Sequence, residues 1–154
     1  SLVQAGNVAI AVSLAGMVAL PVFGRFDPGA GTRRRRLVQF TLGCAALFVL
    51  LALGAGAAID IWVSIAYSLL TGFIVYQYSD VRAAYPASMI GRALALFTMA
   101  MFLGVALMQW ATGAAASAAS GWQVPTYAVV MGAIAAMLAA GAAAFAWLPQ
   151  PPRG

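Results

Sequence analysis

The stretch Gly24–Arg36, which reads GRFDPGAGTRRRR, decides the organisation of this chain. It holds five of the eight basic residues and lies between two long apolar runs, Val3–Phe23 and Leu37–Ala58. Pro28 and the glycines around it interrupt a helix. A bent basic loop between two membrane-length runs predicts that both cross a bilayer, and its charge sets their direction.

Composition places the chain in lipid. Of its 154 residues, 64% are hydrophobic and only 7% are charged, whereas a soluble domain carries about 25% charged residues. The net charge of +5 comes from arginines that fall between apolar runs. This pattern favours membrane orientation over nucleic-acid binding or a nuclear-localisation signal. The single cysteine, Cys44, lies within an apolar run and has no partner for an intrachain disulfide.

Five runs have the length that a membrane-spanning helix needs, which is about 20 residues. They cover about 3–23, 37–58, 61–78, 89–111 and 125–148. We therefore expect an all-α, polytopic transmembrane helix bundle that forms a single membrane domain over residues 1–154. The later breaks are expected near Asp60, at Ser79–Arg92 and in an uncharged loop at Thr112–Val124.

Charged and aromatic residues agree on the orientation of these spans. If the basic stretch is cytoplasmic, all arginines lie on the cytoplasmic side and only Asp60 lies on the other, as the positive-inside rule requires. The tryptophans fall at expected span ends, where interfacial belts form: Trp62, Trp110, Trp122 and Trp147. The N-terminus is thus expected outside and the C-terminus in the cytoplasm. An outside start favours one further helix upstream.

Two stretches resemble the C-terminal half of a major facilitator superfamily transporter. The first is Gly24-Arg25-Phe26-Asp27 followed by Arg33–Arg36. It is similar to the family's glycine–aspartate–arginine signature between the second and third helices of each half, which has a gating role. Here Pro28–Thr32 is inserted, and we expect it to hold Asp27 away from the arginines.

The second stretch looks like the loop and eleventh helix of many bacterial members. It comprises Tyr85-Pro86, Gly91-Arg92-Ala93-Leu94, Gly104, Gln109-Trp110 and Gly113. The resemblance implies that the five runs are helices eight to twelve of a secondary transporter in a bacterial inner membrane, moving a small solute by alternating access. The first, third and fourth runs would then line the central cavity. The cytoplasmic loop motif would consist of Gly24, Arg25, Asp27, Arg33, Arg34, Arg35, Arg36 and Arg92.

Polar side chains in the cavity-lining runs are the candidates for substrate binding. They are Ser13, Tyr67, Ser68, Thr71 and Thr98 at mid-depth, Asn7 and Gln109 nearer the outer mouth, and Phe102 with Met99 as apolar wall. For any one polar residue the alternative is a hydrogen bond between helices, or a hydroxyl bonded to its own helix.

The sequence offers few side chains that could catalyse a reaction or bind a metal ion. There is no histidine, and the three aspartates are isolated from one another, so no carboxylate pair or metal-ligand cluster is expected. We expect neither an enzyme nor a cofactor. None of the expected spans contains a buried ionisable residue, so in a proton-coupled transporter the titrating group would lie outside this chain.

The competing interpretation is a small polytopic scaffold or assembly subunit without transport activity. Small residues at Gly132, Ala136, Ala140 and Ala144 form a stripe along the fifth run. The stripe is either a partner interface or, as we favour, packing inside the bundle. The expected partners are the lipid bilayer, a small-molecule substrate, and an upstream helix with an N-terminal half or a second copy. Nucleic acid is not among them.

Overall fold

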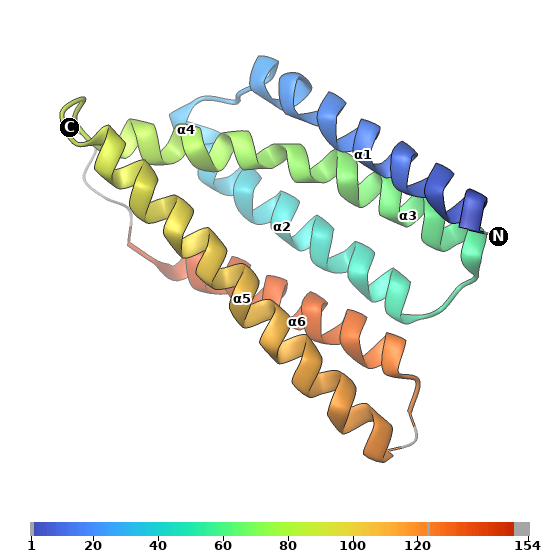
Figure 1. Cartoon of the computed structure of the whole chain (residues 1–154). Coiled ribbons are helices and arrows are strands. Elements are labelled where there is room, and N and C mark those ends of the chain that lie inside the picture. The colour runs from blue at the N-terminus through green and yellow to red at the C-terminus, as the bar shows by residue number, and fades with distance from the viewer. Residues whose placement is uncertain (1, 123, 150–154) are drawn as a thin grey trace.

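The computed structural model describes residues 2–122 and 124–149, which are almost entirely helical. The elements are α1 (Leu2–Arg25), α2 (Ala30–Ala52), α3 (Ala57–Leu70), the 3₁₀ turn η1 (Thr71–Phe73), α4 (Ile74–Ala84), α5 (Ile90–Trp122) and α6 (Thr126–Trp147). Because α3, η1 and α4 run on as one rod, five helical segments are long and apolar enough to cross a membrane (Figure 1). The predicted all-α, membrane-spanning fold is confirmed.

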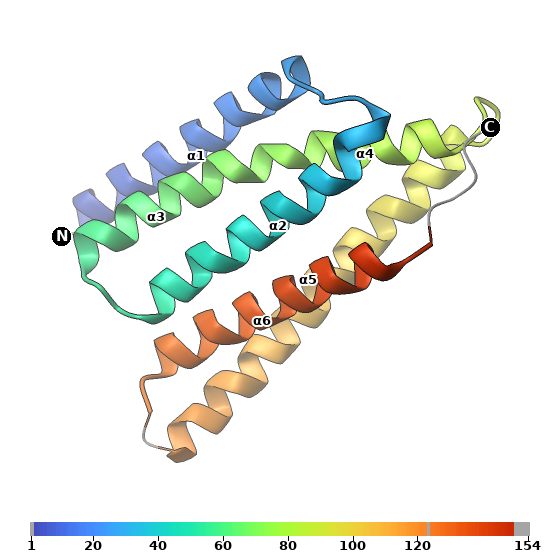
Figure 2. The same ribbon diagram turned by 180° about the vertical axis from the view of Figure 1, so that it is seen from behind.

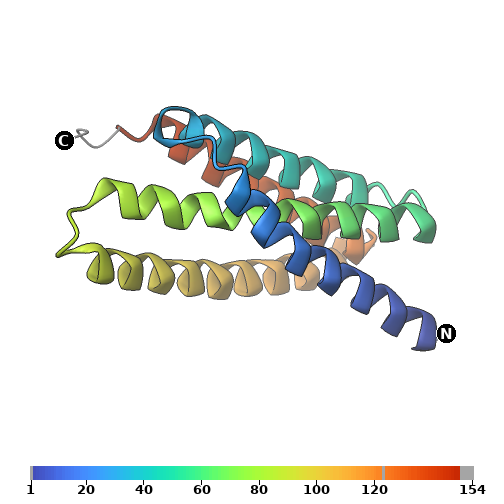
Figure 3. The same cartoon turned by 90° about the horizontal axis from the view of Figure 1, so that it is seen from above.

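The five segments form a bundle in which α2 is central. It packs against α6 and against the rod α3–η1–α4. The outer helices are α1, which packs on that rod, and α5, which packs on α6 and α4 (Figures 1 and 2). Seen from above, α1 crosses the rod obliquely and its N-terminal end diverges from the other helices (Figure 3).

Most breaks between the helices are shorter than the sequence predicted, but the break expected near Asp60 lies earlier and is longer, at residues 53–56. The expected loop Thr112–Val124 is helical as far as Trp122, because alanine is the best helix former and no proline intervenes before Pro125. The third segment extends over Ala57–Ala84. It therefore takes in Asp60, which has a buried oxygen without a hydrogen-bond partner in the described chain, and Asp80. The expectation that no span contains a buried ionisable residue is wrong, because Arg33 is buried within the candidate span Ala30–Ala52.

Glycine and proline determine where the helices of the first half begin and end. Gly29 and Gly56 precede α2 and α3 with φ of 77° and 112°, and Gly54 follows α2 with φ of 62°. These left-handed conformations favour glycine. Since α2 already begins at Ala30, the arginines Arg33–Arg36 lie in its first two turns rather than in a loop.

The tryptophans follow the expected interfacial pattern only in part. Trp62 lies near the start of α3, and Trp122 and Trp147 are the last residues of α5 and α6. Trp110 lies inside α5 and its side chain is 75% exposed. Because α5 has 33 residues, Trp110 does not mark the end of this helix, and whether it lies at the end of the membrane-crossing part stays a prediction. Such a helix is about 50 Å long, well beyond a hydrocarbon core of about 30 Å.

Small residues bring α1 against the third segment. The Ser68 hydroxyl donates a hydrogen bond of 2.6 Å to the Val12 carbonyl, and Gly16 faces Ser68. One turn further, a Cβ on Gly72 would lie 2.7 Å from the Ala19 Cβ and 2.8 Å from the Ala19 carbonyl carbon and oxygen. This crossing leaves no room for a side chain at position 72.

An aromatic cluster joins three segments just beyond that crossing. The Phe23 ring of α1 lies 5.2 Å from Phe40 of α2 and 5.4 Å from Tyr76 of α4, between ring centroids. Tyr76 is buried, and its hydroxyl donates a hydrogen bond of 2.9 Å to the Phe26 carbonyl. Aromatic pairs of this kind add about 0.5–1.5 kcal/mol beyond the area they bury. The cluster therefore fixes the chain after α1 against α4.

The small-residue stripe of α6 lies elsewhere than we expected. Ala136, Ala140 and Ala144 are exposed, whereas the buried alanines of this helix are Ala135 and Ala142. The interpretation that the stripe packs inside the bundle is wrong. The helix instead presents a neighbouring row of alanines to the bundle, since residues seven apart lie on one face of a helix.

Candidate functional site

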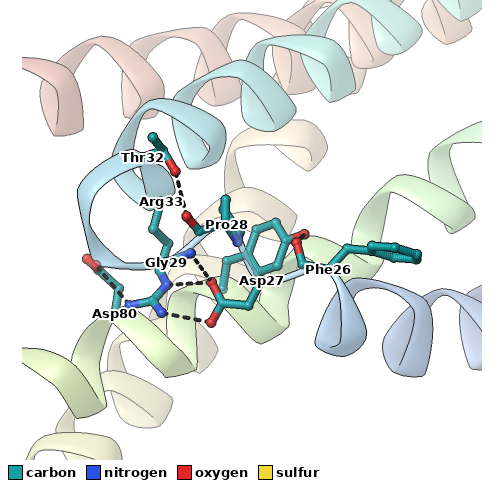
Figure 4. A network of polar contacts seen from close by, with 8 residues as sticks. Phe26, Asp27, Pro28, Gly29, Thr32, Arg33 and Asp80 are labelled. Carbon is teal, nitrogen blue, oxygen red and sulfur yellow. Dashed lines mark hydrogen bonds and ion pairs between the residues drawn. The ribbon is translucent and has the colours of Figure 1, made fainter.

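Arg33 is the most deeply buried charged residue among those described. It lies in the first turn of α2, and its side chain is only 8% exposed. The guanidinium donates two hydrogen bonds to the Asp27 carboxylate, from Nε to Oδ1 at 3.2 Å and from Nη2 to Oδ2 at 2.7 Å. Its Nη1 lies 3.9 Å from Oδ1 of Asp80 on α4 (Figure 4). We call Asp27, Arg33 and Asp80 the Arg33 cluster.

The turn between α1 and α2 builds this cluster. The Gly29 N–H donates to Asp27 Oδ1 at 3.1 Å, and the Thr32 hydroxyl donates to the Pro28 carbonyl at 2.8 Å (Figure 4). The expectation that the insertion holds Asp27 away from the arginines is wrong. The insertion forms the turn and the start of α2, and the first helical turn carries Arg33 back over Asp27.

The charges of the cluster compensate one another. The hydrogen bond from Arg33 holds the pKa of Asp27 below its usual value, against the opposing effect of partial burial, and the Gly29 N–H adds to the lowering. Arg33 Nη1 is buried and makes no hydrogen bond to any described residue, so only Asp80 balances that side of the guanidinium. Arg33 is therefore firmly bound to Asp27 and loosely paired with Asp80.

Arg34 has a different role from its neighbour. Its Nη2 donates to the carbonyls of Phe145, at 2.6 Å, of Ala146 and of Leu148, and its guanidinium lies 5.1 Å from the centre of the Phe145 ring. The last carbonyls of a helix have no partners within the helix and carry partial negative charge. Arg34 therefore caps α6, while Arg35 and Arg36 stay exposed.

A cavity of about 390 Å³ lies beside the Arg33 cluster, between α2, α4, α5 and α6. Its lining is mainly apolar, with three polar side chains. The apolar residues are Leu37, Val38, Val81, Phe97, Gly141, Ala142 and Phe145, and the polar ones are Thr41, Gln77 and Asp80. Asp80 thus belongs to both the cluster and the cavity.

Three of the substrate-binding candidates make contacts within the bundle. The Ser68 hydroxyl makes a hydrogen bond to α1, and the Thr71 hydroxyl donates a hydrogen bond of 2.7 Å to the Ser68 carbonyl of its own segment. The Tyr67 ring packs edge-on against Phe48 of α2 at 5.0 Å. These contacts are the ordinary helix packing that the sequence left open as the alternative.

The remaining candidates are spread over other surfaces. The Thr98 hydroxyl lies 3.5 Å from that of Tyr78, while Asn7, Ser13 and Gln109 are exposed. Phe102 is 71% exposed, and Met99 is comparable. None of the eight candidates lines the cavity beside the Arg33 cluster. The structure does not bring them together into one pocket.

The rest of the loop motif is also dispersed. Arg25 ends α1 and is exposed, and Gly24 approaches the Val75 side chain. Arg92 is exposed near the start of α5. All arginines of the described chain nevertheless lie at the same end of the bundle, at the end of α1 or α4 or the start of α2 or α5. Arg153 lies outside the described residues.

Sequence reasoning missed the residues of the cavity. Gln77, Asp80 and Val81 share one face of α4, because residues three and four apart lie side by side on a helix. The sequence does not reveal this face, because it predicts a loop from Ser79 onward and so separates Asp80 from Gln77. The described residues contain no group of three or more His, Cys, Asp or Glu side chains that could hold a metal ion.

Comparison of the chain with known protein families, curated proteins and solved structures gives no significant match. The resemblance to the major facilitator superfamily therefore rests on the sequence motifs. What the structure establishes is an integral membrane bundle with the Arg33 cluster, in which Arg33 itself is buried, at its arginine-rich end.

Proposed function

We propose that this chain is the C-terminal portion of a secondary active transporter that moves a small solute by alternating access. The arginine-rich end would be cytoplasmic and the N-terminus outside, in a bacterial inner membrane. The observation that carries the proposal is the Arg33 cluster. A buried ion pair adds little net stability, and ionisable residues inside membrane segments are usually functional. A contact of this kind suits a protein that makes it in one state and breaks it in another.

The two sides of the cluster differ in strength, which suggests how it would work. Arg33 holds Asp27 by two hydrogen bonds but approaches Asp80 only to 3.9 Å. The turn after α1 and the start of α2 would therefore move together, and the contact with α4 would open. The 3₁₀ turn η1, within the same rod as Asp80, is a further place where the third segment can bend.

Unpaired helix faces also support the proposal. Ala119 is the one buried residue among the described residues of α5, and many of the exposed side chains of this helix are large and apolar: Leu96, Met99, Phe102, Leu103, Leu107 and Trp110. Helix α1 is similar, with only Ala19 buried. These are two of the segments that the resemblance assigns to the central cavity and the contact with the other half.

Thiol labelling in native membranes tests the proposal without knowledge of the substrate. In a Cys44→Ala background, Ser13→Cys and Phe102→Cys should react with a charged, membrane-impermeant methanethiosulfonate reagent, because a water-filled path would reach both. Leu42→Cys on α2, which is also exposed in this chain, should not react if it faces lipid. Equal protection of all three cysteines would contradict transport.

The scaffold function remains a second candidate because of the exposed alanines on α6. Ala136, Ala140 and Ala144 offer a smooth surface on which another helix can pack closely. In a scaffold, Ala136→Leu should reduce the size of the complex extracted from native membranes, as measured on native gels. Ala106→Leu, at an exposed alanine of α5, is the matched control. No change in size with Ala136→Leu would argue against this function.

A further inference from the structure

The cavity between α2, α4, α5 and α6 has the chemistry of an amine site. We propose that it binds a soluble primary ammonium ion carried on an apolar body, with Asp80 as the counter-ion. The proposal concerns a site inside this chain and does not depend on whether the protein is a transporter or a scaffold.

Asp80 has unused capacity to bind a cation. Among the described residues it is the only charged one in the cavity lining, and its side chain is 39% exposed. No hydrogen bond reaches its carboxylate from any described residue, and its one ion-pair contact, to Arg33 Nη1, is 3.9 Å long. Arg33 is mainly committed to Asp27. A carboxylate has about four acceptor positions, which here point to a ligand with several donors.

The other two polar groups of the lining add acceptors. The Thr41 hydroxyl already donates its hydrogen to the Leu37 carbonyl at 2.8 Å, so it can only accept a further bond. The Gln77 side chain makes no hydrogen bond within the described chain, and its oxygen is a third acceptor. A primary ammonium has three donors and no acceptor. An anion would instead meet Asp80 with the same charge.

The remaining walls fit an apolar body. Phe97 and Phe145 come from α5 and α6, and each is held in place by a further contact. Phe97 packs edge-on to Tyr78 at 5.2 Å, and Phe145 carries the Arg34 guanidinium at 5.1 Å. Aromatic rings also attract cations. A volume of about 390 Å³ lies in the usual range for small-ligand sites, roughly 300–1,000 Å³.

The two neighbouring guanidinium groups already have partners. Arg33 is paired with Asp27, and Arg34 is bound to the carbonyls at the end of α6. None of the described residues that line the cavity is cationic. An aminophospholipid headgroup would therefore find no partner there for its phosphate. This absence favours a soluble amine over a lipid.

Equilibrium dialysis of radiolabelled 2-phenylethylammonium tests the proposal, with the full chain in a neutral maltoside detergent. The wild type should bind it saturably, and 3-phenylpropanoate, its anionic analogue, should not compete. Asp80→Asn should weaken binding roughly 10- to 100-fold, the range for losing a charge-assisted hydrogen bond. Asp60→Asn, near the opposite end of the same rod, should leave binding unchanged.

A second pair of variants tests the location without altering the cluster. A Cβ on Gly141 would meet nothing within 4 Å, so the backbone at this position accepts a side chain, and Gly141→Leu should fill the cavity and abolish binding. Gly132 on the same helix is equally open but does not line the cavity, and Gly132→Leu should bind as the wild type does.

Three results would overturn the proposal. They are no saturable binding by the wild type, equal binding by Asp80→Asn, and equal binding by Gly141→Leu. Competition by added phosphatidylethanolamine but not by phosphatidylglycerol would refute the soluble amine and make a lipid headgroup the occupant.

Discussion

The contact between Gly72 and Ala19 gives the most quantitative test of the fold. We consider Gly72→Ala, which adds one methyl group where α1 crosses η1. The new Cβ would lie 2.7 Å from the Ala19 Cβ and 2.8 Å from two backbone atoms of Ala19. Carbon atoms in favourable contact lie about 3.5–4.0 Å apart. No change of rotamer relieves the contact with backbone, so α1 must move away by roughly 1 Å.

Two opposing effects set the expected magnitude. Overpacking a tight contact costs about 1–3 kcal/mol, whereas alanine in place of glycine stabilises a helix by about 0.5–1 kcal/mol. Gly132→Ala on α6 should only stabilise its helix and not overpack a contact, because its Cβ meets nothing within 4 Å. The two variants should therefore differ in free energy of unfolding by the overpacking term, about 1–3 kcal/mol, with Gly72→Ala the less stable.

The chain carries its own reporter for this measurement. Cys44 is its only cysteine and is buried, so a thiol-reactive dye should label it only on unfolding. The free energy of unfolding is obtained by titrating detergent-solubilised protein with dodecyl sulfate and following the labelling. If Gly72→Ala is as stable as Gly132→Ala, α1 does not cross the third segment as closely as described.

Further predictions concern single polar contacts, each measured by the same unfolding titration. Ser68→Ala should lose about 0.6 kcal/mol, the average for a hydrogen bond between membrane helices, whereas Ser64→Ala, whose hydroxyl bonds only its own helix, should change little. Arg34→Gln should cost about 0.3–1 kcal/mol as the cap of α6 is lost, and Arg35→Gln, at an exposed position, should be neutral. Because the folded-state pKa of Asp27 is lowered, its pairing stabilises the protein above the unfolded pKa and is lost as the pH falls through the lower folded value. The free energy of unfolding of the wild type should therefore decrease once the pH falls below the ordinary carboxyl pKa of 3.8. This decrease should be absent in Asp27→Asn.

The number of spanning segments was predictable because it depends on hydropathy summed over about 20 residues. Their ends were not. The small and polar residues after Ala111 predict a loop, yet the alanines among them extend α5 to Trp122. The break at Pro28 was foreseen, since proline acts locally, but the start of α2 directly after it was not.

The candidate site was less accessible to sequence reasoning. The pairing of Arg33 with Asp27 depends on the left-handed conformation of Gly29, and a spacing of six residues does not reveal it. Ser68 and Thr71 were chosen for their polarity, but each hydroxyl is used within the bundle. Which way a hydroxyl turns is decided by the neighbouring helix, and that neighbour is known only from the fold.

The oblique crossing of α1 gives this helix the mechanics of a lever. Its tightest contact, at Ala19, lies about 26 Å from Leu2 and about 9 Å from Arg25, at 1.5 Å per residue. If the helix pivots rigidly there, a displacement of its short arm is enlarged about threefold at the N-terminal end. The short arm leads into the turn that holds Asp27 and Arg33. A shift of about 1 Å in that turn would therefore swing the opposite end of α1 by about 3 Å, across the membrane from the arginines.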